Sequence, residues 1–426
     1  MSVAIKTLRG LNRINFLNRK EDSFWNDLDE KEAKMHKIHI YPAKFPSLIA
    51  QKAFKYAKKN KLQLSRVADI FCGCGTVAVE AKRKGIDFWG CDINPVAVLI
   101  SQAKCGNYDI EKVESLRDSV LASYRGNNFC PDYQSANERI KYWFYEAQYN
   151  DLAKLKNAIE TETEDDDYRK LFLCLFSSIL KGTSKWLTKS IKPQVDPEKH
   201  LTDKKKPADV LGLFNKQADL ALKAIKEIAY PDDRRPEIRL LDVLKIEEYN
   251  IADMLVTSPP YVTSYEYADL HQLSALWLGY AEDYTELRQD SIGSSYGTEK
   301  VEYTLLPTAQ KIVNYFQSGL SQSRAVARYY NDMHQFVGKS YNILRPGGVA
   351  VFVIGDTEYK TNRIENAKAL CESMIEYGYT INVITKRKVQ NKFLPSHRAE
   401  SGKFSSNKQD RAIYSQEYII IGRKGQ

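Results

Sequence analysis

Short apolar runs separated by helix-like stretches recur along the chain from about residue 67 onward. Residues 67–71 are apolar apart from one aspartate, a pattern that predicts a buried strand. Residues 76–84 carry an apolar stripe at helical spacing, and a second strand-like run covers residues 87–91. Strand, helix and strand in this order predict a β–α–β unit, the building block of parallel sheets.

The second half of the chain returns to the same alternation, which predicts an α/β protein. A third strand is expected to end near Asp242. The pattern further predicts strands at 254–256, 349–354, 380–385 and 417–422, and helices at 265–280, 321–343 and 364–377.

A long insertion, residues 106–236, separates these two halves. Apolar residues recur at helical spacing over 110–124 and 140–159. Residues 171–180 form an apolar run that we expect to be a buried helix, and another helix is expected over 208–229. The insertion is therefore predicted to be mostly helical, either as cover for the sheet or as a separate lobe.

The loop between the first strand and its helix contains Gly73 and Gly75. Glycine lets the backbone approach a ligand closely, and the start of the following helix offers free N–H groups. Asp92, at the end of the second strand, suits hydrogen bonding to both hydroxyls of a ribose. Because Gly73, Gly75 and Ala78 also satisfy the dinucleotide pattern, a nicotinamide enzyme stays open at this point.

A second motif follows the short strand at 254–256, where residues 257–261 read Thr-Ser-Pro-Pro-Tyr. Two consecutive prolines cannot continue a sheet ladder, so they force a stiff, extended loop. Such a loop presents carbonyl acceptors, a hydroxyl and an aromatic ring in a fixed geometry. Ligands of open α/β sheets bind at the carboxyl ends of the strands, so we expect this loop and the glycine loop to meet along one edge.

Three segments together resemble a known family. Residues 69–76 (Asp-Ile-Phe-Cys-Gly-Cys-Gly-Thr) and 257–261 look like motifs of the DNA methyltransferases that modify exocyclic amino groups, and residues 39–46 (His-Ile-Tyr-Pro-Ala-Lys-Phe-Pro) look like the family's remaining cofactor motif. The resemblance implies an α/β, Rossmann-like class I methyltransferase fold, with a seven-stranded mixed sheet and a large helical insertion. It also implies S-adenosylmethionine as cofactor and double-stranded DNA as partner. Two departures are small, with Ile70 where the family often has Pro and Val77 where it often has Thr.

The form Ser-Pro-Pro-Tyr is typical of the cytosine-N4 branch, so a site-specific cytosine-N4 DNA methyltransferase is the favoured function. An adenine-N6 enzyme, an RNA base methyltransferase and a catalytically silent nucleic-acid-binding protein of the same fold are the alternatives. A nicotinamide enzyme would leave residues 258–261 unexplained. Covalent cytosine-C5 chemistry is disfavoured, because neither Pro259 nor Pro260 precedes a cysteine and Cys130 precedes a proline instead of following one.

The catalytic residues expected from the resemblance are Ser258, Pro259, Pro260 and Tyr261. An exocyclic amino group is a poor nucleophile, and acceptors for its hydrogens assist as charge grows on nitrogen. The Ser258 hydroxyl and the Pro259 carbonyl are the candidate acceptors. A base in a duplex must be flipped out to reach such a site, and Tyr261 is its expected stacking partner. A sulfonium is already an activated methyl donor, so alignment is the main requirement and no metal site is expected.

The resemblance also assigns contacts to the cofactor. The loop residues are expected to shape its methionine end, and Asp92 to hold its ribose. Ile93 is expected to pack on the adenine, while Asp242 either accepts from the adenine amino group or simply caps a helix. The full expected set is Phe45, Asp69, Phe71, Gly73, Gly75, Thr76, Asp92, Ile93 and Asp242.

Composition and charge narrow the class of protein further. Among 426 residues, 63 Lys and Arg outweigh 54 Asp and Glu, and the net charge of +9 favours a polyanionic partner. The 7 cysteines lack a second close pair at metal spacing, which indicates reduced thiols. The chain has no apolar run of about 18 residues and begins without the apolar stretch of a signal peptide, so we expect a cytoplasmic protein without a membrane span.

These observations divide the chain into four parts. Residues 1–35 are expected to form a loosely packed basic arm, and residues 36–105 the first part of the methyltransferase domain with the cofactor motifs. Residues 106–236 are the helical insertion, a candidate DNA-recognition lobe. Residues 237–426 form the second part, with the catalytic loop and a basic loop at 386–411 that we expect to contact phosphates. A cognate restriction endonuclease is a candidate partner, and the sequence does not predict the oligomeric state.

Overall fold

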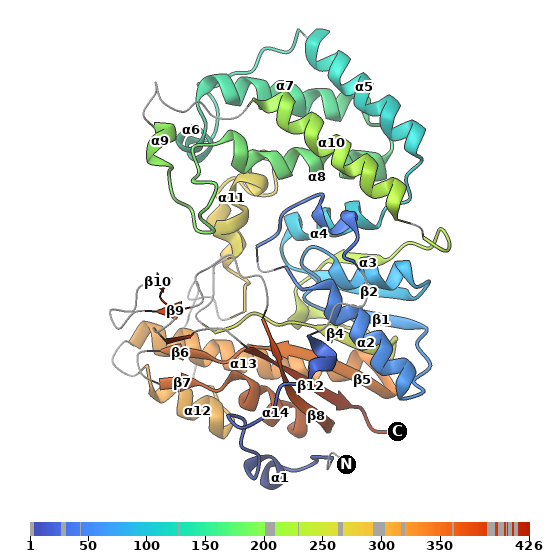
Figure 1. Cartoon of the computed structure of the whole chain (residues 1–426). Coiled ribbons are helices and arrows are strands. Elements are labelled where there is room, and N and C mark those ends of the chain that lie inside the picture. The colour runs from blue at the N-terminus through green and yellow to red at the C-terminus, as the bar shows by residue number, and fades with distance from the viewer. Residues whose placement is uncertain are drawn as a thin grey trace.

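A twisted sheet forms the lower part of the molecule, and a lobe of helices stands above it (Figure 1). The structure is a computed structural model. It describes residues 4–26, 31–42, 44–126, 128–200, 209–228, 230–262, 267–292, 303–316, 320–359, 362–389, 397–398, 404–405, 407, 411–412 and 416–426. None of the helices in these ranges combines the length and the apolar character that crossing a membrane requires.

The main sheet has seven strands and confirms the predicted fold. They are β1 (Arg66–Asp69), β2 (Asp87–Asp92), β3 (Glu237–Leu240), β4 (Ala252–Thr257), β5 (Leu344–Ile354), β8 (Thr380–Lys388) and β12 (Gln416–Arg423). Their order is β3-β2-β1-β4-β5-β12-β8. The strands β1 to β5 are parallel, whereas β12 runs antiparallel to both of its neighbours, which makes the sheet mixed as expected.

The order of the strands reverses at the contact between β1 and β4. From β1 the chain proceeds outward to β2 and β3, and from β4 it proceeds in the other direction to β5. Val67 and Ala68 on β1 pair with Met254 and Leu255 on β4. The carboxyl edge beside such a reversal is where open α/β sheets bind ligands, and both sequence motifs follow these two strands.

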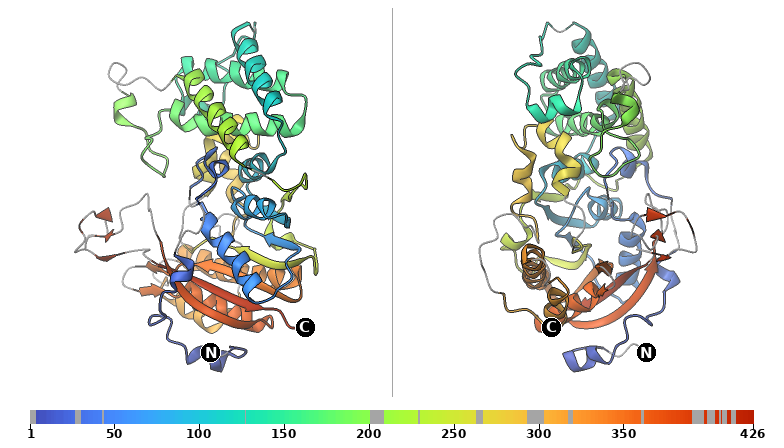
Figure 2. Two further views of the ribbon diagram at one scale, coloured as in Figure 1. Left: turned by 45° about the vertical axis from the view of Figure 1, so that its right-hand side comes forward. Right: turned by 90° about the vertical axis from the view of Figure 1, so that its left-hand side faces the viewer.

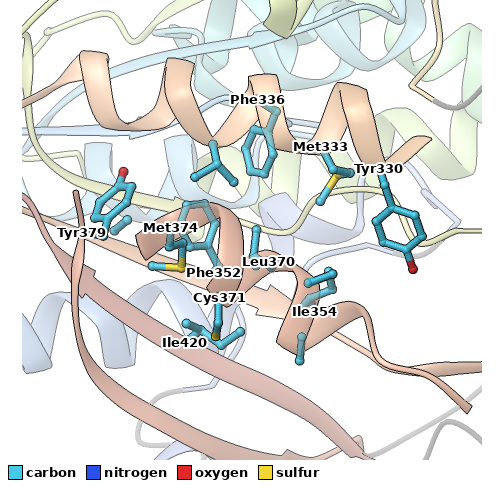
Figure 3. Packing of buried hydrophobic residues seen from close by; sticks show 14 of the residues in the cluster. Tyr330, Met333, Phe336, Phe352, Ile354, Leu370, Cys371, Met374, Tyr379 and Ile420 are labelled. Atoms are coloured by element: carbon cyan, nitrogen blue, oxygen red, sulfur yellow. The ribbon is translucent and has the colours of Figure 1, made fainter. Parts of the chain in front are cut away.

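Alternating residues of β5 show how the sheet is buried on both faces. Val351 and Val353 belong to one apolar cluster, and Phe352 and Ile354 belong to the other. Side chains of successive residues in a strand point to opposite faces, so an unbroken apolar run buries both. Figure 3 shows Phe352 and Ile354 packed with Phe336 and Met374 on the second face.

Helices cover each face of the sheet. The cluster with Val351 includes residues of α2 (Ser47–Lys59), α3 (Thr76–Arg83) and α4 (Pro95–Cys105). The cluster with Phe352 includes residues of α12 (Pro307–Asn314), α13 (Leu320–Ile343) and α14 (Asn366–Glu376). The structure thus places the helices predicted at 321–343 and 364–377 on one face of the sheet.

The insertion forms a helical lobe around a third apolar cluster, to which residues of α4 also contribute. Its helices are α5 (Ile110–Gly126), α6 (Glu138–Trp143), α7 (Glu146–Glu162), α8 (Asp166–Thr183), α9 (Pro197–His200) and α10 (Val210–Glu227). The predicted buried run 171–180 lies in α8, where Phe172 and Phe176 are fully buried. The views in Figure 2 show this lobe standing clear of the strands.

One helix of the second half of the chain also belongs to the lobe. Helix α11 (Tyr267–Trp277) follows the proline motif, and its residues Leu273 and Trp277 lie in the apolar cluster of the lobe. Trp277 contacts Phe144 and Phe176, with ring centroids 5.6 and 5.7 Å apart. The segment after the proline motif therefore connects the sheet edge to the helical lobe.

The N-terminal segment is not the loosely packed arm that its basic residues suggested. It contains α1 (Leu8–Asn12) and the 3-10 helices η1 (Ser23–Trp25) and η2 (Lys34–Lys37). Leu11, Phe16 and Trp25 are buried, and Ile5 bridges to Ile381 of β8. Burial of these apolar side chains outweighs the preference of the interspersed basic residues for solvent, so the segment packs along the sheet.

The prediction that residues 386–411 form a phosphate-contacting loop is wrong for the first two of these residues. They belong to β8, where Lys386 and Arg387 are buried and make hydrogen bonds to protein groups, so they are not available to contact phosphates. Of the six later Lys and Arg residues, Lys392, Lys403 and Lys408 lie outside the described residues. The remaining elements are η3 (Val243–Lys245), η4 (Tyr284–Arg288), β6 (Thr357–Tyr359), β7 (Asn362–Ile364), β9 (His397–Arg398), β10 (Phe404–Ser405) and β11 (Arg411–Ala412).

Candidate active site

The glycine loop has the backbone conformation that its sequence predicts. Gly73 and Gly75 have φ angles of +50° and +76°, in the left-handed region that favours glycine. A Cβ atom on Gly75 would lie 2.6 Å from the Cβ of Ser101 in α4, so a larger residue does not fit. Gly75 is the N-cap of α3, and Thr76 is its first, buried residue. The loop therefore brings backbone close to the start of a helix, as an anion- or cofactor-binding turn requires.

Asp92 closes this loop from the neighbouring strand. Its Oδ2 accepts a hydrogen bond from the Gly73 N–H at 2.8 Å, and its Oδ1 accepts one from the Asn94 N–H at 2.9 Å. Burial raises the pKa of Asp92, and the backbone hydrogen bonds oppose this. Ile93 follows immediately and is half-buried, so its side chain is accessible beside the carboxyl group.

Asp69 ends β1 and is almost completely buried. Its Oδ1 accepts hydrogen bonds from the Phe71 N–H at 3.1 Å and from the Thr257 hydroxyl at 2.7 Å. Burial and, to a smaller extent, the nearby charge of Asp92 raise the pKa of Asp69 to about 7, although the two hydrogen bonds oppose the rise. Two carboxyl groups thus lie near each other at the carboxyl edge of the sheet.

The hydrogen bond between Asp69 and Thr257 joins the two motifs directly. Thr257 is the last residue of β4, and Asp69 is the last residue of β1, its parallel neighbour. The two motifs are 188 residues apart in sequence but lie on one edge of the sheet. The structure therefore bears out the expectation that the glycine turn and the proline segment meet.

The proline segment is held by hydrogen bonds from both sides. The Ser258 hydroxyl donates to the Val353 carbonyl of β5 at 3.0 Å, which leaves lone pairs of its oxygen as acceptors. The Pro260 carbonyl accepts a hydrogen bond from the Tyr329 hydroxyl of α13 at 2.8 Å. Pro259 between them is buried. The carbonyl of Pro260 is thus engaged by the protein, which distinguishes it from the expected acceptor at Pro259.

Tyr261 is half-buried at the end of the segment. Its hydroxyl donates to Glu417 Oε1 on β12 at 3.1 Å. The ring lies against Gly355, where an added Cβ would come within 2.9 Å of the Tyr261 Cε2 atom. The ring is therefore located by a hydrogen bond at one end and by close backbone contact at its side.

The early motif at 39–46 lies against the glycine loop. A Cβ atom on Gly73 would lie 3.6 Å from the Tyr41 Cε1 atom, so the Tyr41 ring covers this glycine. The same ring stacks on His271 of α11, with centroids 4.7 Å apart. Phe45 is half-buried and packs against the apolar cluster between α2, α3 and the sheet. The motif therefore contacts the loop through Tyr41, a residue absent from the expected set.

Asp242 follows β3 at the same edge of the sheet. Its Oδ1 accepts a hydrogen bond from the Leu244 N–H at 2.9 Å, so it is the N-cap of η3. The neighbouring Leu241 N–H donates to the Asp92 carbonyl at 3.0 Å, which places Asp242 beside the end of β2. The structure therefore shows the capping role that the sequence allows for Asp242.

Several residues of this edge escaped the sequence analysis. Two of them lie within recognised motifs: Tyr41 in residues 39–46, and Thr257, whose hydroxyl is a recognisable donor, in residues 257–261. The others share no local motif, because each reaches the edge from a distant element. They are Tyr329, Gly355, Arg387 and Glu417.

The polar groups around the glycine loop fit a cofactor that carries a positive charge and a nucleoside. The buried carboxyl group of Asp69 and the half-buried carboxyl group of Asp92 lie beside a turn in which backbone replaces side chains at Gly73 and Gly75. Carboxyl oxygens suit an ammonium or sulfonium group and ribose hydroxyls. Within the described ranges, no group of three or more His, Cys, Asp or Glu residues is arranged to hold a metal ion.

Comparison with known proteins supports the same conclusion. The family model of the DNA methylases that act at N6 or N4 matches residues 12–103 and 252–426, more than half of the chain. The chain is 26% identical to the type II methyltransferase M.MvaI of Kocuria varians over 410 residues, which are 87% of this chain and 88% of the relative. It is 22% identical to M.AvaI of Nostoc sp. over 79% of this chain and 77% of that relative. It is also 29% identical to M.MjaII of Methanocaldococcus jannaschii over 35% of this chain and 28% of that relative.

The family match covers six of the seven strands, and it omits β3 and most of the helical lobe. The residues between 103 and 252 fall outside the matched ranges, whereas all three motifs fall inside them. The match confirms S-adenosylmethionine as the cofactor and DNA as the substrate class. The chain belongs to the DNA methylase family of N6 and N4 amino-methyltransferases.

Proposed function

We propose that this protein is a site-specific DNA methyltransferase that transfers the methyl group of S-adenosylmethionine to cytosine N4. The observation that carries the proposal is the hydrogen bond of 2.7 Å between Thr257 and Asp69, which unites the cofactor loop and the Ser-Pro-Pro-Tyr segment at the switch point of the sheet. The serine form of that segment favours cytosine N4 over adenine N6.

The cofactor-binding residues are proposed along the ends of three parallel strands. Asp69, Gly73 and Gly75 bind the methionine end, with Phe71 and Thr76 completing the turn and Phe45 packed behind it. Asp92 binds the ribose hydroxyls, and Ile93 and Asp242 contact the adenine. The raised pKa of Asp69 supports this assignment, because a buried carboxyl group of raised pKa gains most from the cationic methionine end.

The proposed chemistry requires acceptors for the hydrogens of the base amino group. When bound, S-adenosylmethionine supplies an activated methyl group on a sulfonium sulfur. The Ser258 oxygen and the Pro259 carbonyl accept hydrogen bonds from the amino group, which increases the electron density on its nitrogen as the new bond forms. The donation from Ser258 to the Val353 carbonyl supports this role, because it directs the hydroxyl hydrogen away and leaves the oxygen as an acceptor.

The target base must leave the duplex to reach this edge. Tyr261 is proposed to stack on the flipped ring, since a ring held at the end of a stiff segment offers a flat surface in a constant position. Pro259 and Pro260 keep the segment extended. The half-buried state of Tyr261 supports this role, because a stacking residue has to expose part of its ring before the base arrives.

The helical lobe is proposed to read the DNA sequence. Residues 106–236 form this part, between cofactor-domain segments 36–105 and 237–426. Its connection to the catalytic segment through α11 supports the proposal, because a lobe that contacts DNA would then lie next to the site of transfer. Relatives named type II methyltransferases support a role in restriction and modification, with a cognate endonuclease as partner.

Labelled S-adenosylmethionine and duplex DNA test the proposal. The expected result is label in DNA, with N4-methylcytosine released on digestion and methylated cytosines mapped to one short sequence. Release of N6-methyladenine alone would reject the cytosine-N4 assignment but would still show a DNA amino-methyltransferase. Label in tRNA and not in DNA would reject the DNA substrate. Normal DNA and cofactor binding without transfer would identify a silent member of the fold.

A further inference from the structure

Tyr261 is hydrogen-bonded to a charged pair on the last strands of the sheet. Its hydroxyl donates to Glu417 Oε1 at 3.1 Å, and the other oxygen of this carboxylate accepts from Arg387 Nε at 2.9 Å and Nη2 at 2.8 Å. The three side chains thus form a continuous chain of polar contacts. Tyr261 and Glu417 are 156 residues apart in sequence.

The topology of the sheet places this pair at the catalytic edge. β12 runs antiparallel to β5, so its first residues lie beside the last residues of β5, and Tyr418 pairs with Ile354. Glu417 stands directly opposite Arg387 in the antiparallel ladder of β12 and β8. A residue in a paired strand has little freedom to move, so the carboxylate has a fixed position.

Burial makes the pair a rigid anchor. The Arg387 side chain is 5% exposed and the Glu417 side chain 21%. An arginine that engages one carboxylate through two nitrogens fixes its orientation as well as its charge. A hydrogen bond from the Tyr261 hydroxyl to an ionised acceptor is stronger than one to a neutral acceptor.

Gly355 fixes the ring from a second direction. An added Cβ on Gly355 would come within 2.9 Å of Tyr261 Cε2, and the Gly355 carbonyl accepts from the Asn366 side chain at 3.0 Å. Asn366 in turn accepts from the Tyr330 hydroxyl at 2.7 Å. The backbone against which the ring lies is therefore held in place from α13 and α14.

We propose that Glu417 and Arg387 are positioning residues that orient the Tyr261 ring for stacking on the extruded base. This rests on the proposed function, in which Tyr261 is the stacking surface. Stacking requires the plane of the ring to be constant, and the stem of a tyrosine alone leaves rotation about two side-chain bonds. The hydrogen bond to Glu417 removes that freedom before the base arrives, so binding of the base carries no further entropic cost for ordering the Tyr261 ring.

The test uses the full-length protein with duplex DNA that carries a fluorescent base analogue beside the mapped target base. Four variants are compared: Tyr261→Phe, Tyr261→Ala, Glu417→Gln and the double variant Tyr261→Phe/Glu417→Gln. Tyr261→Phe keeps the ring and removes its donor, while Glu417→Gln keeps an acceptor and removes the ion pair. We measure the fluorescence change on base extrusion, the single-turnover rate, the apparent affinity for DNA and the melting temperature.

Tyr261→Phe and Glu417→Gln are each expected to lower the single-turnover rate and the extrusion signal about tenfold, with DNA affinity and cofactor affinity unchanged. In the double variant the single-turnover rate and the extrusion signal are also expected to fall about tenfold, because both changes interrupt one chain of contacts. Glu237→Gln is the matched control, since it neutralises an ion pair with Arg66 (2.7 Å) at the opposite, amino-terminal edge of the sheet. It is expected to leave rate and signal unchanged.

Three other results would contradict the proposal in different ways. Wild-type extrusion and rate in Tyr261→Phe, together with loss of both in Tyr261→Ala, would overturn the positioning role and keep the stacking role. Unchanged extrusion in Tyr261→Ala would overturn the stacking role itself, and with it the proposed function of this residue. A loss in Glu417→Gln that matches a lowered melting temperature, without a change in Tyr261→Phe, would also overturn the proposal.

Discussion

The two sides of the catalytic edge are assembled in different ways. On the cofactor side, defined as residues 69–94, the hydrogen bonds within the turn are local, such as the one from the Gly73 N–H to Asp92 across 19 residues of sequence, and the bond from Thr257 to Asp69 links this side to the other. On the base side, defined as residues 258–261 with their partners, the contacts reach Val353, Tyr329 and Glu417, across 95, 69 and 156 residues. The cofactor side is built mainly from one continuous stretch, whereas the base side depends on residues of β5, α13 and β12.

Substitutions should affect the two sides in different ways. A unit built from a turn and a strand end is sensitive to its own backbone geometry, so one added atom disrupts it. A segment held by several distant side chains loses its position stepwise as each support is removed. Substitutions on the two sides should therefore differ in size and in which step they affect.

The largest effect is expected for Gly75→Ala on the cofactor side. Alanine disfavours a φ angle of +76°, and its Cβ would lie 2.6 Å from that of Ser101. Strain and overpacking together should lower the free energy of unfolding by about 3 kcal/mol, and cofactor binding should be lost. Urea unfolding and calorimetric titration with S-adenosylmethionine measure both quantities.

Gly279→Ala is the matched control for this substitution. Gly279 has a similar φ angle of +71°, and an added Cβ there would meet no atom within 4 Å. It should lose about 1 kcal/mol of stability from backbone conformation alone and keep its cofactor affinity. Equal losses in the two variants would show that the contact with Ser101 has no part in the effect.

The next effect concerns Thr257, which joins the two sides. Thr257→Val keeps the shape of this fully buried side chain and removes the donor to Asp69. Loss of a hydrogen bond to a buried carboxyl group should lower stability by about 2 kcal/mol, as measured by urea unfolding. Thr257→Ser retains the hydroxyl and should retain most of the stability, so a full loss in the serine variant would contradict the role of the hydrogen bond.

The same division explains what the sequence predicted. The strand, the two glycines and Asp92 lie within one local pattern, and turn chemistry sufficed to place them. The seven-stranded sheet followed from the resemblance, and the proline motif was recognised from its own residues. Glu417 and Arg387 were not found, because a cross-strand ion pair carries no signal until the pairing of β12 with β8 is known.

Two predictions differ from the structure for one physical reason. Basic residues suggest a loosely packed arm at 1–35 and a phosphate-contacting loop at 386–411, although each segment also contains groups that the sheet buries. Lys386 extends its ammonium group to the Leu17 carbonyl at 2.7 Å, and Phe16 packs on Tyr418. Charge predicts solvent exposure poorly where long side chains lie along an apolar surface with only their ends in polar contacts.

A smaller effect is expected from pH on the cofactor side. The pKa of Asp69 is raised to about 7, so the group becomes neutral as the pH falls below 7. A cationic ligand prefers the ionised form, so affinity for S-adenosylmethionine should fall by up to about tenfold per pH unit below 7. Calorimetric titrations between pH 8 and 6 measure this, and Asp69→Asn should remove most of the dependence.

The stability of the protein without cofactor should change in the opposite direction. Because folding raises the pKa of Asp69 from 3.8, the folded state holds this proton more tightly than the unfolded state. The contribution of Asp69 to stability is therefore greatest below pH 3.8 and is lost as the pH rises through about 7. If unfolding of the wild type and of Asp69→Asn had the same pH dependence from 5 to 8, a raised pKa of Asp69 would be contradicted.

The smallest effect is expected for Tyr329→Phe on the base side, where one of several supports is removed. The Pro260 carbonyl loses its donor at 2.8 Å, while Ser258 and Tyr261 keep their own contacts. The single-turnover rate should fall about fivefold, because a neutral hydrogen bond contributes about 1 kcal/mol, and cofactor affinity should stay unchanged. Tyr341→Phe, on the same helix beside Tyr379, is the control and should leave the rate unchanged. A loss of cofactor affinity in Tyr329→Phe would show that the two sides are coupled through α13, and the division between a local and a distributed half would no longer hold.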